Sequence, residues 1–413
     1  MISESVLNFG YTLLDKVTGF SPLAVYSTYT SVVRQGLVPD FVLRLAIRAL
    51  CRQRLREIDY GSFEANHAAK MQWIAKSRAR ETIADLTEKA NEQHYEVPSC
   101  LGHHSRRIAA LLILNMLQVS TDFILSCLGP CAKYSACLYP TGKETLEEAE
   151  VLMMEMYCEK AKLRDGQYVL DLGCGWGSLS LYLAQKYPRS SIIGLSNSST
   201  QKLYIDAQAK KRGLNNIKIV TADVNIIDFV DCEQFDRILS IEVFLFSSMF
   251  EHMKNYDMLL RRISTWLKPS QYKGEDEDPD PSLLFVHIFC HRNMPYNFEE
   301  EDGWMAQMFF SGGTMPSHDL FLYYQTDLTL LSSSYLSGTH YSRTLEHWLQ
   351  RQDANAGRGL KELEEDAEKK GKKGEGAKAF YRFRVFYMAC SELFAYDGGQ
   401  EWGVGHYVFK RKD

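Results

Sequence analysis

The sequence predicts an α/β fold in which a doubly wound parallel sheet carries helices on both faces. Three observations predict it. Strand-like and helix-like segments alternate from about residue 163 onward. A glycine-rich turn joins the first of these strands to the helix that follows it. The first 145 residues instead place apolar side chains at helical spacing, which indicates a helical region ahead of the sheet.

The composition is that of a globular chain long enough for two or three packed units. Its 413 residues are 45% hydrophobic and 24% charged. A net charge of −5 argues against a nucleic-acid binder, which needs a basic face. The ten cysteines stand singly, without the paired spacing of a metal site, and the first residues do not have the order of a secretory signal. We therefore expect reduced thiols, no bound metal and a cytoplasmic protein.

The N-terminal helical region, residues 1–145, contains two helix-like segments, 38–58 and 62–89. A third stretch, from Ile108 to Leu128, is nearly long enough to cross a bilayer. Polar residues interrupt it, and Asp122 would be costly at the centre of a membrane. A buried helix pair is the preferred interpretation, with no stable membrane span, and a peripheral membrane contact stays open.

The second region, residues 146–413, is expected to hold the sheet and the elements that close over a ligand. The strands are expected at 167–172, 191–195, 217–221, 235–241 and 283–289, and the helices at 178–186, 200–212 and 253–267. Two charged segments interrupt this pattern. The segment 272–282 is acidic and contains proline, and 360–378 is rich in lysine and glutamate. Both are predicted to be surface insertions, and 360–378 is expected to be partly helical.

Glycines follow the first strand in the run Asp171-Leu172-Gly173-Cys174-Gly175-Trp176-Gly177. Glycine permits a tight turn and a close approach of the backbone to a ligand, and the next helix offers free N–H groups. Asp171 precedes the first glycine, and an acidic strand end suits the ammonium group of S-adenosylmethionine, whereas it would repel a pyrophosphate. The sequence therefore predicts an S-adenosylmethionine site that includes Asp171, Gly173, Gly175 and Gly177.

Polar residues also follow the next two strands. Asn197 and Gln201 come after the second strand and offer groups for the ribose and methionine parts of the cofactor. Asp223 and Val224 come after the third, where a carboxylate can accept a hydrogen bond from the adenine amino group. Each segment alone also fits a helix cap or a turn. Since α/β ligands gather at the carboxyl ends of strands, the three segments together favour a cofactor site.

Further motifs lie outside the glycine turn: Lys133-Tyr134-Ser135, the F-E-H-x-x-x-Y stretch of residues 250–256, the G-G-T-M-P-S stretch of residues 312–317 and Gly338-Thr339-His340-Tyr341. With the turn, they resemble the cyclopropane-fatty-acid synthase superfamily, and within it the coclaurine N-methyltransferase-like proteins. The resemblance covers nearly the whole chain, from residue 39 to 410.

The resemblance implies a class I S-adenosylmethionine-dependent methyltransferase with a Rossmann-like sheet, whose acceptor is the nitrogen of a small-molecule amine. It implies that Tyr134 and Ser135 reach over the cofactor, and that Glu242, Glu251 and His252 line the acceptor pocket. An amine must be neutral when it attacks, a carboxylate can hold its ammonium form, and a histidine can take the proton. We therefore expect Glu251 to bind the amine and His252 to accept its proton.

Two departures from the family pattern keep other functions open. Six mostly apolar residues, Phe244 to Met249, separate two glutamates that family members usually place one helical turn apart. This insertion could leave a protein that binds the cofactor but is catalytically impaired. Ala136 stands where cyclopropane synthases usually have cysteine, which disfavours transfer to a lipid. Groups resembling the base site of those synthases, Glu251, His287 and Tyr341, are nevertheless present, so a lipid acceptor stays an alternative.

Overall fold

The computed structural model describes residues 38–83, 121–222, 227–229, 234–242, 250, 253–270, 279–298 and 313–412. Within these residues the helices are α3 (Asp40–Glu57), α4 (Phe63–Arg78), α7 (Thr121–Cys127), α8 (Leu146–Lys160), α9 (Ser178–Lys186), α10 (Ser199–Arg212), α11 (Tyr256–Trp266), α12 (Gly338–Ala354), α13 (Ala356–Lys369) and α14 (Glu375–Ala395), with short 3-10 turns η4 (Leu320–Tyr323) and η5 (Tyr396–Gly399). The strands are β1 (Tyr168–Leu172), β2 (Ser191–Ser196), β3 (Ile217–Thr221), β4 (Arg237–Ile241), β5 (Leu283–His291), β6 (Tyr296–Asn297), β7 (Thr314–Met315), β8 (Leu328–Leu336) and β9 (Trp402–Arg411).

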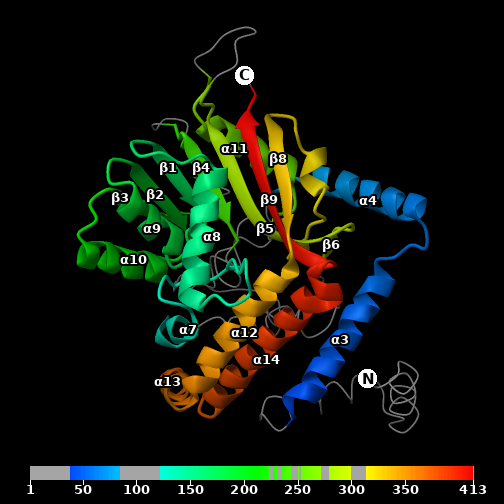
Figure 1. Cartoon of the computed structure of the whole chain (residues 1–413), viewed down its shortest axis with the longest axis vertical. Coiled ribbons are helices and arrows are strands. Elements are labelled where there is room, and N and C mark those ends of the chain that lie inside the picture. Colours follow the sequence, from blue (N-terminus) through cyan, green and yellow to red (C-terminus); the bar gives the residue numbers. More distant parts are fainter. Residues whose placement is uncertain are drawn as a thin grey trace, which may run out of the picture.

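Seven strands form one sheet in the order β3-β2-β1-β4-β5-β9-β8 (Figure 1). The first five are parallel, and the chain reverses direction across the sheet between β1 and β4, as in a doubly wound fold. β9 lies antiparallel between β5 and β8. The α/β prediction is confirmed, but the sheet is mixed rather than wholly parallel. The sequence pattern does not predict β8 and β9. β9 contains Gly403 and Gly405, and β8 contains three serines, and these residue types are poor strand formers.

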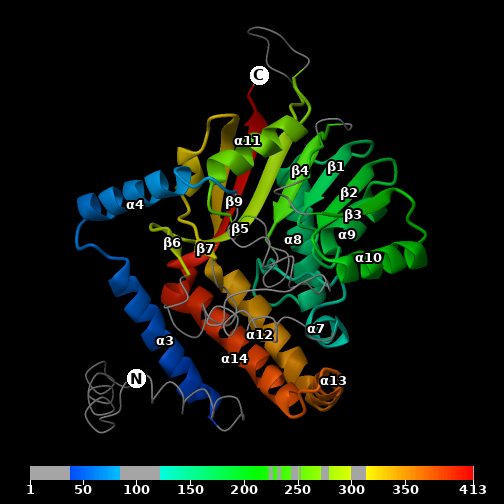
Figure 2. The ribbon, with the colours of Figure 1, turned by 180° about the vertical axis from the view of Figure 1, so that it is seen from behind.

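Alternate residues of the central strands face opposite sides of the sheet and pack on different helices. On β1, Val169 packs with α8 and α9, whereas Leu170 packs with α11 on the other face. Phe285 and Leu284 repeat this pattern on β5. The view from behind shows α11 across the second face, with α4 beside the β8 edge of the sheet (Figure 2). Because both faces are covered, every residue of β4 and β5 is buried.

A bundle of α3, α7, α12 and α14 lies beyond the carboxyl ends of the parallel strands (Figure 1). Trp348 of α12 and Phe386 of α14 are fully buried in it. Arg44 and Arg48 of α3 both pair with Glu392 of α14, whose side chain is only 7% exposed. These ion pairs attach α3 to the rest of the bundle.

The predicted N-terminal helices are present where the structure describes them. The helix expected at 38–58 is α3, and the one expected at 62–89 is α4, which is shorter and ends at Arg78. Of the stretch from Ile108 to Leu128, the structure describes only the end, where α7 buries Phe123; the remainder lies outside the described residues. No helix in the described part of the chain has the length and apolar character needed to cross a membrane.

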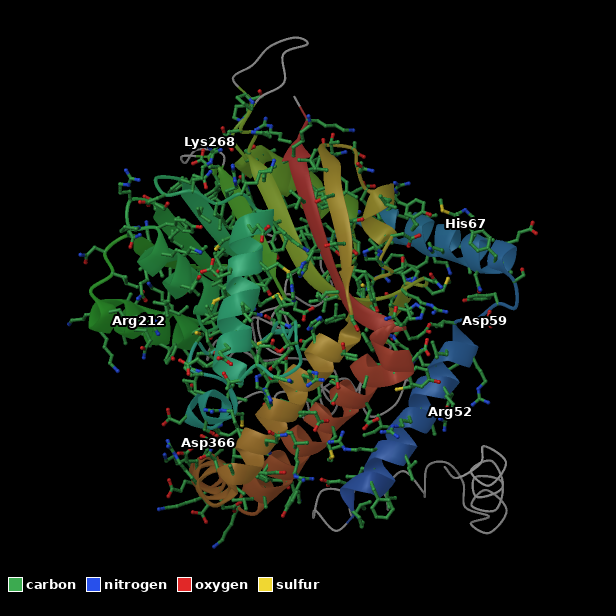
Figure 3. The ribbon with its side chains drawn as sticks, in the orientation of Figure 1. Arg52, Asp59, His67, Arg212, Lys268 and Asp366 are labelled. Atoms are coloured by element: carbon green, nitrogen blue, oxygen red, sulfur yellow. The ribbon has the colours of Figure 1, made fainter. Side chains whose placement is uncertain are left out.

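The segment 360–378, predicted as a partly helical surface insertion, contains helix, and part of it is buried. α13 and the start of α14 run through this segment, and Leu363 is only 3% exposed. A Cβ on Gly376 would lie 2.4 Å from the backbone of Glu364, so the two helices pack closely. Charged side chains cover the outer side, as Asp366 does at the edge of the molecule in Figure 3. Because most residues of these two helix segments are charged, the composition does not indicate that one side of them is buried.

The acidic segment 272–282 is described only from residue 279 onward. Asp280 accepts a hydrogen bond of 2.6 Å from Arg237, the first residue of β4. Arg237 is 1% exposed, so the end of the loop neutralises a guanidinium group that is buried at the edge of the sheet.

Candidate active site

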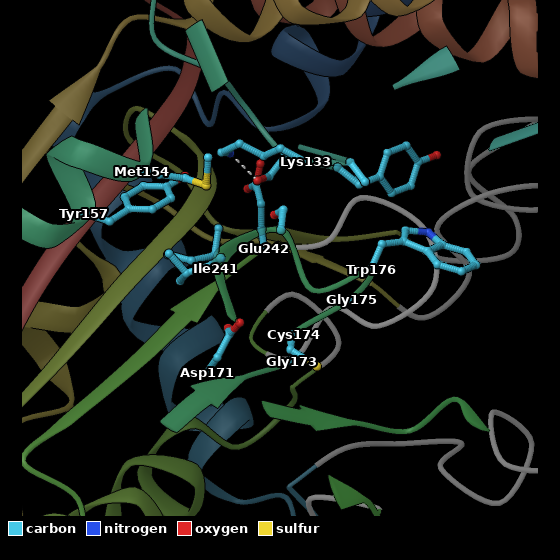
Figure 4. Close-up of a pocket in the computed structure, with 15 residues that line it drawn as sticks. Lys133, Met154, Tyr157, Asp171, Gly173, Cys174, Gly175, Trp176, Ile241 and Glu242 are labelled. Carbon is cyan, nitrogen blue, oxygen red and sulfur yellow. Dashed lines mark hydrogen bonds between the residues drawn. The ribbon is translucent and has the colours of Figure 1, made fainter. Parts of the chain in front are cut away.

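A cavity lies between the carboxyl ends of β1 and β4 and the segment that precedes α8 (Figure 4). The glycine turn forms one wall of it, and buried polar side chains form much of the rest. It is lined by Ala132, Lys133, Tyr134, Ser135, Met154, Tyr157, Asp171, Gly173, Cys174, Gly175, Trp176, Ser178, Leu179, Ile241 and Glu242. This is the edge of the sheet at which doubly wound folds bind their ligands.

The backbone of the turn requires glycine. Gly173, Gly175 and Gly177 have φ angles of 90°, 52° and 77°, in the left-handed region that a Cβ disfavours. Gly177 has no space for a side chain either, because a Cβ would lie 2.6 Å from Ile205 of α10. α9 begins at the next residue, Ser178, so the N–H groups of its first turn lie beside the cavity.

Asp171 lies near the end of β1 in the cavity wall and is 1% exposed. Its Oδ2 accepts a hydrogen bond of 2.5 Å from Ser180 Oγ of α9. Burial raises the pKa of the Asp171 carboxyl group to about 6, although the bond from Ser180 favours the ionised form. A cation in the cavity would favour ionisation further, so this carboxylate fits a ligand ammonium group.

Three buried polar atoms on the same edge of the sheet have no hydrogen-bond partner within the described residues. Asn197 Oδ1 after β2, Thr221 Oγ1 at the end of β3 and Trp176 Nε1 in the turn accept or donate no hydrogen bond within the described part of the chain. Buried polar atoms are nearly always hydrogen-bonded in proteins, so these three indicate a polar ligand. The hydroxyl, amino and carboxyl groups of S-adenosylmethionine fit this mixture of donors and acceptors.

Gln201 is held within the turn that follows β2. Its Oε1 accepts a hydrogen bond of 2.7 Å from Ser196 Oγ, and its backbone N–H donates to Ser198 Oγ, the N-cap of α10. The helix cap that the sequence also allowed is therefore present at Ser198, next to the candidate ligand-binding residue Asn197. Asp223 and Val224 lie outside the described residues, and their contact with adenine stays a prediction.

Tyr134 and Ser135 border the cavity from the segment before α8. The Tyr134 ring packs on Trp348 of the bundle, with ring centroids 5.1 Å apart. Ser135 Oγ accepts a hydrogen bond of 2.6 Å from Lys133 Nζ, and Lys133 is 1% exposed. Burial lowers the pKa of this lysine. Lys133 is a cavity residue that sequence reasoning missed, since only its position next to the Tyr-Ser pair could have suggested it.

Glu242 lines the cavity at the end of β4. The backbone N–H of Phe289 donates to its Oε2, and its Oε1 lies 3.7 Å from His287 Nε2. Burial raises the pKa of the Glu242 carboxyl group to about 7, against the opposing effects of the Tyr341 hydroxyl, the Phe289 N–H and Lys133. Burial makes ionisation of this carboxylate unfavourable, and a cation bound beside it would offset that cost.

The structure brings Glu242, His287 and Tyr341 together. The backbone N–H of Glu242 donates to the His287 carbonyl at 3.0 Å. Tyr341 is fully buried on α12, and its ring stacks on Phe394 with centroids 4.4 Å apart. Other predicted parts of the acceptor site lie outside the described residues and stay predictions: Glu251, His252 and the insertion from Phe244 to Met249.

Comparisons with known proteins agree with this geometry. The family model described as mycolic acid cyclopropane synthetase matches residues 105–394. An (S)-coclaurine N-methyltransferase of Thalictrum flavum subsp. glaucum is 35% identical over 381 residues, which cover 91% of this chain and 93% of that protein. The crystal structure of a coclaurine N-methyltransferase bound to N-methylheliamine and SAH has a TM-score of 0.77 at 31% identity, and the match covers 95% of this chain and 100% of that one.

A mycolic acid cyclopropane synthase complexed with SAH shares the fold, with a TM-score of 0.56 at 21% identity over 75% of this chain. The family match, the similarity along most of the chain and the glycine turn all lead to the same assignment. The chain belongs to the mycolic acid cyclopropane synthetase family, as an S-adenosylmethionine-dependent methyltransferase of the coclaurine N-methyltransferase-like branch.

Proposed function

We propose that this enzyme methylates the nitrogen of a small-molecule amine, with a cyclic amine as the favoured acceptor class. The observation that carries the proposal is Glu242, a buried carboxylate in the cavity beside the glycine turn, with a pKa of about 7. Such a carboxylate attracts an ammonium group, because the opposite charge restores its ionised form. The similar proteins named as coclaurine N-methyltransferases support a cyclic amine.

The cofactor side of the cavity positions one substrate. When bound, the cofactor supplies a methyl carbon that is open to in-line displacement at a sulfonium centre. Asp171 would hold the ammonium group of its methionine part, and Asn197 and Thr221 would bind its hydroxyl groups. Tyr134 and Ser135 would cover it. Since these residues only have to hold the reactants in line, positioning accounts for much of the rate enhancement in this proposal.

The acceptor side must hold an amine and remove its proton. In this proposal Glu251 binds the amine, and His252 accepts the proton that leaves the nitrogen, since a histidine with a pKa near 6.5 does so readily at neutral pH. Glu242 supplies a carboxylate in the wall of the cavity. His287 Nε2 lies 3.7 Å from that carboxylate, and the Tyr341 hydroxyl favours its ionised form against the effect of burial.

The test combines calorimetry with product analysis. Purified enzyme is titrated with S-adenosylhomocysteine and then incubated with S-adenosylmethionine and a panel of cyclic and aliphatic amines, with monounsaturated phospholipid vesicles in parallel. We expect binding and a gain of one methyl mass on at least one amine. Methylation of the lipid alone would contradict the proposal in favour of the lipid alternative. Binding without methyl gain on either substrate would favour the impaired enzyme.

A deletion of Phe244 to Met249 separates an impaired site from a missing substrate. If the insertion displaces a catalytic glutamate, the shortened enzyme gains activity on the same amine panel. Unchanged stability and activity would contradict the hypothesis that the insertion impairs the enzyme. The substitution Leu203→Ala, at a side chain that is 70% exposed on α10, is a control for general effects of altering the chain.

We also propose that the enzyme resides in the cytosol. Support comes from the eight cysteines within the described residues, which are free thiols. A fluorescent fusion is expected to be diffuse in the cytosol, and denatured protein from cells lysed with a thiol-blocking reagent is expected to carry the blocking group on all ten cysteines. Secretion of the fusion would contradict this proposal.

A further inference from the structure

A row of polar side chains leads from Glu242 along the face of the sheet that α8 covers to the surface. His287 of β5 and His406 of β9 are direct cross-strand partners, and His287 Nδ1 lies 2.7 Å from His406 Nε2. His406 Nδ1 lies 2.8 Å from Nζ of Lys160, the last residue of α8. At the inner end, His287 Nε2 lies 3.7 Å from Glu242 Oε1.

Only the lysine end of this row meets solvent. His287 and His406 are each 1% exposed, whereas Lys160 is half-buried and donates to Oγ of the exposed Ser334 at 2.6 Å. Burial, together with the positive charges of nearby lysines, holds the pKa of both histidines well below its ordinary value. Each ring is therefore neutral at pH 7, with one N–H donor and one nitrogen that only accepts.

Burial lowers the pKa of Lys160 from its ordinary value. In its charged form the Lys160 ammonium group donates and never accepts, so it fixes the direction of every hydrogen bond in the row. His406 Nδ1 must accept from it, so the proton of His406 is on Nε2 and is donated to His287 Nδ1. His287 must then carry its own proton on Nε2, the nitrogen that faces Glu242. The Tyr157 hydroxyl lies 3.1 Å from the same nitrogen, His287 Nδ1.

We propose that Lys160 is a positioning residue that acts through His406. It sets the tautomer of His287, so that an N–H donor rather than a lone pair faces the Glu242 carboxylate. An N–H group directed at a carboxylate favours its ionised form, whereas a lone pair in the same place favours the protonated acid. The consequence for catalysis rests on the proposed function, since an amine-binding carboxylate must be ionised. The tautomer itself does not depend on that function.

Other titratable groups face the row, but they leave the tautomer undecided. Lys133 lies over the Tyr157 ring at 5.3 Å and donates to Ser135 Oγ and to a backbone carbonyl. The Tyr341 hydroxyl acts on Glu242 from α12. The Tyr157 hydroxyl can donate or accept, and so permits both forms of His287. The charged Lys160 permits one form only, which makes it the decisive group.

Nitrogen NMR tests the tautomer directly. Two-bond proton–nitrogen correlations are recorded at about pH 7.5 on protein with labelled histidine, for the natural enzyme, Lys160→Met and Lys160→Arg. We expect the Nε2–H form of both histidines in the natural enzyme and in Lys160→Arg, whose guanidinium also only donates. Lys160→Met is expected to lose this single form. Assignments come from His287→Gln and His406→Gln, and an Nδ1–H form of His287 in the natural enzyme would overturn the proposal.

Kinetics supply a second readout. The acid limb of the pH profile of kcat/KM is expected to move upward by about 0.5 to 1 pH unit in Lys160→Met and to return in Lys160→Arg. The matched control is Lys186→Met, which removes a lysine that pairs with Glu155 of α8 away from the histidines and is expected to move neither the limb nor the tautomer. Equal profiles for Lys160→Met and the natural enzyme would overturn the proposed effect on Glu242. If the natural enzyme methylates no amine, the proposed function fails and the NMR result alone decides the inference.

Discussion

The pKa of Glu242, about 7, places its titration at neutral pH, where the enzyme is expected to work. Because the carboxylate rather than the acid binds an ammonium group, kcat/KM is expected to rise as pH increases through about 7. Glu242→Gln is expected to lower kcat/KM about 10- to 100-fold, the loss of one charge-assisted hydrogen bond. Initial rates of methyl transfer between about pH 5.5 and 9 measure both effects. An acid limb that persists unchanged in Glu242→Gln would assign the titration to another group, such as His252.

The same carboxyl group costs stability in the substrate-free protein. Its pKa rises from 4.5 when unfolded to about 7 when folded, so between these values the folded state binds more protons. The free energy of unfolding therefore falls as pH increases through that window, by about 3 kcal/mol in total. Glu242→Gln is expected to raise the free energy of unfolding at about pH 8 by up to that amount and to change it little at about pH 4. Urea denaturation at both pH values measures this, and an equal effect at both would contradict it.

At the scale of elements, the glycine turn determines how closely α9 and α10 approach β1. Gly177→Ala is expected to destabilise the fold by about 3 kcal/mol, because strain at a φ of 77° adds to a collision with Ile205. It is also expected to weaken binding of S-adenosylhomocysteine, measured by calorimetry. Gly213→Ala is the matched control: it has a φ of 68° but nothing within 4 Å of the added Cβ, so only about 1 to 2 kcal/mol should be lost. Equal losses of stability in Gly177→Ala and Gly213→Ala would show that Ile205 moves away from the added Cβ at little cost.

The elements that carry the cofactor site are those that the sequence predicts best. The helix expected at 178–186 and the strand expected at 217–221 have the observed bounds, and the helix expected at 200–212 begins one residue earlier. Glycines, caps and short apolar runs mark these boundaries locally. The helices over 360–378 were harder to predict as packed elements, because a charged face dominates their composition while a few side chains such as Leu363 are buried.

At the scale of the whole molecule, charge attaches α3 to the bundle. Burial raises the pKa of Glu392, but hydrogen bonds from Arg48 and Arg44 outweigh it and hold the pKa below its ordinary 4.5. Its stabilising effect is therefore complete above about pH 5 and is lost as pH falls below 4.5 toward the folded pKa. Glu392→Gln is expected to lower the free energy of unfolding at neutral pH by about 1 to 3 kcal/mol and to increase amide exchange in α3.

A surface pair provides the comparison for that variant. Glu155→Gln removes the partner of Lys186 at an exposed site and is expected to change stability by less than about 1 kcal/mol. Amide exchange in α3 is expected to stay as in the natural protein. Comparable losses in Glu155→Gln and Glu392→Gln would contradict a specific attachment of α3 through Glu392.

The order of the strands in the sheet could not be predicted from the sequence. The family resemblance names Glu242 for the acceptor pocket and His287 and Tyr341 for a base site, but it does not say that the three lie together. The row that continues through His406 to Lys160 could not be named in advance, because it depends on which strand lies next to β5. Pairing between distant strands leaves no local signal, and the glycines on both sides of His406 obscure even the strand itself.

The place of β9 between β5 and β8 has a consequence for biosynthesis. β5 ends at His291 and β9 begins only at Trp402, a stretch that takes roughly 5 to 20 s to translate. Until then β5 is an open edge, although all nine of its residues are buried in the finished sheet. An exposed apolar edge strand is a template for aggregation. Nascent chains are therefore at risk before His406 can reach His287, and the yield of active enzyme is expected to depend on low expression temperature and on chaperones that shield this edge.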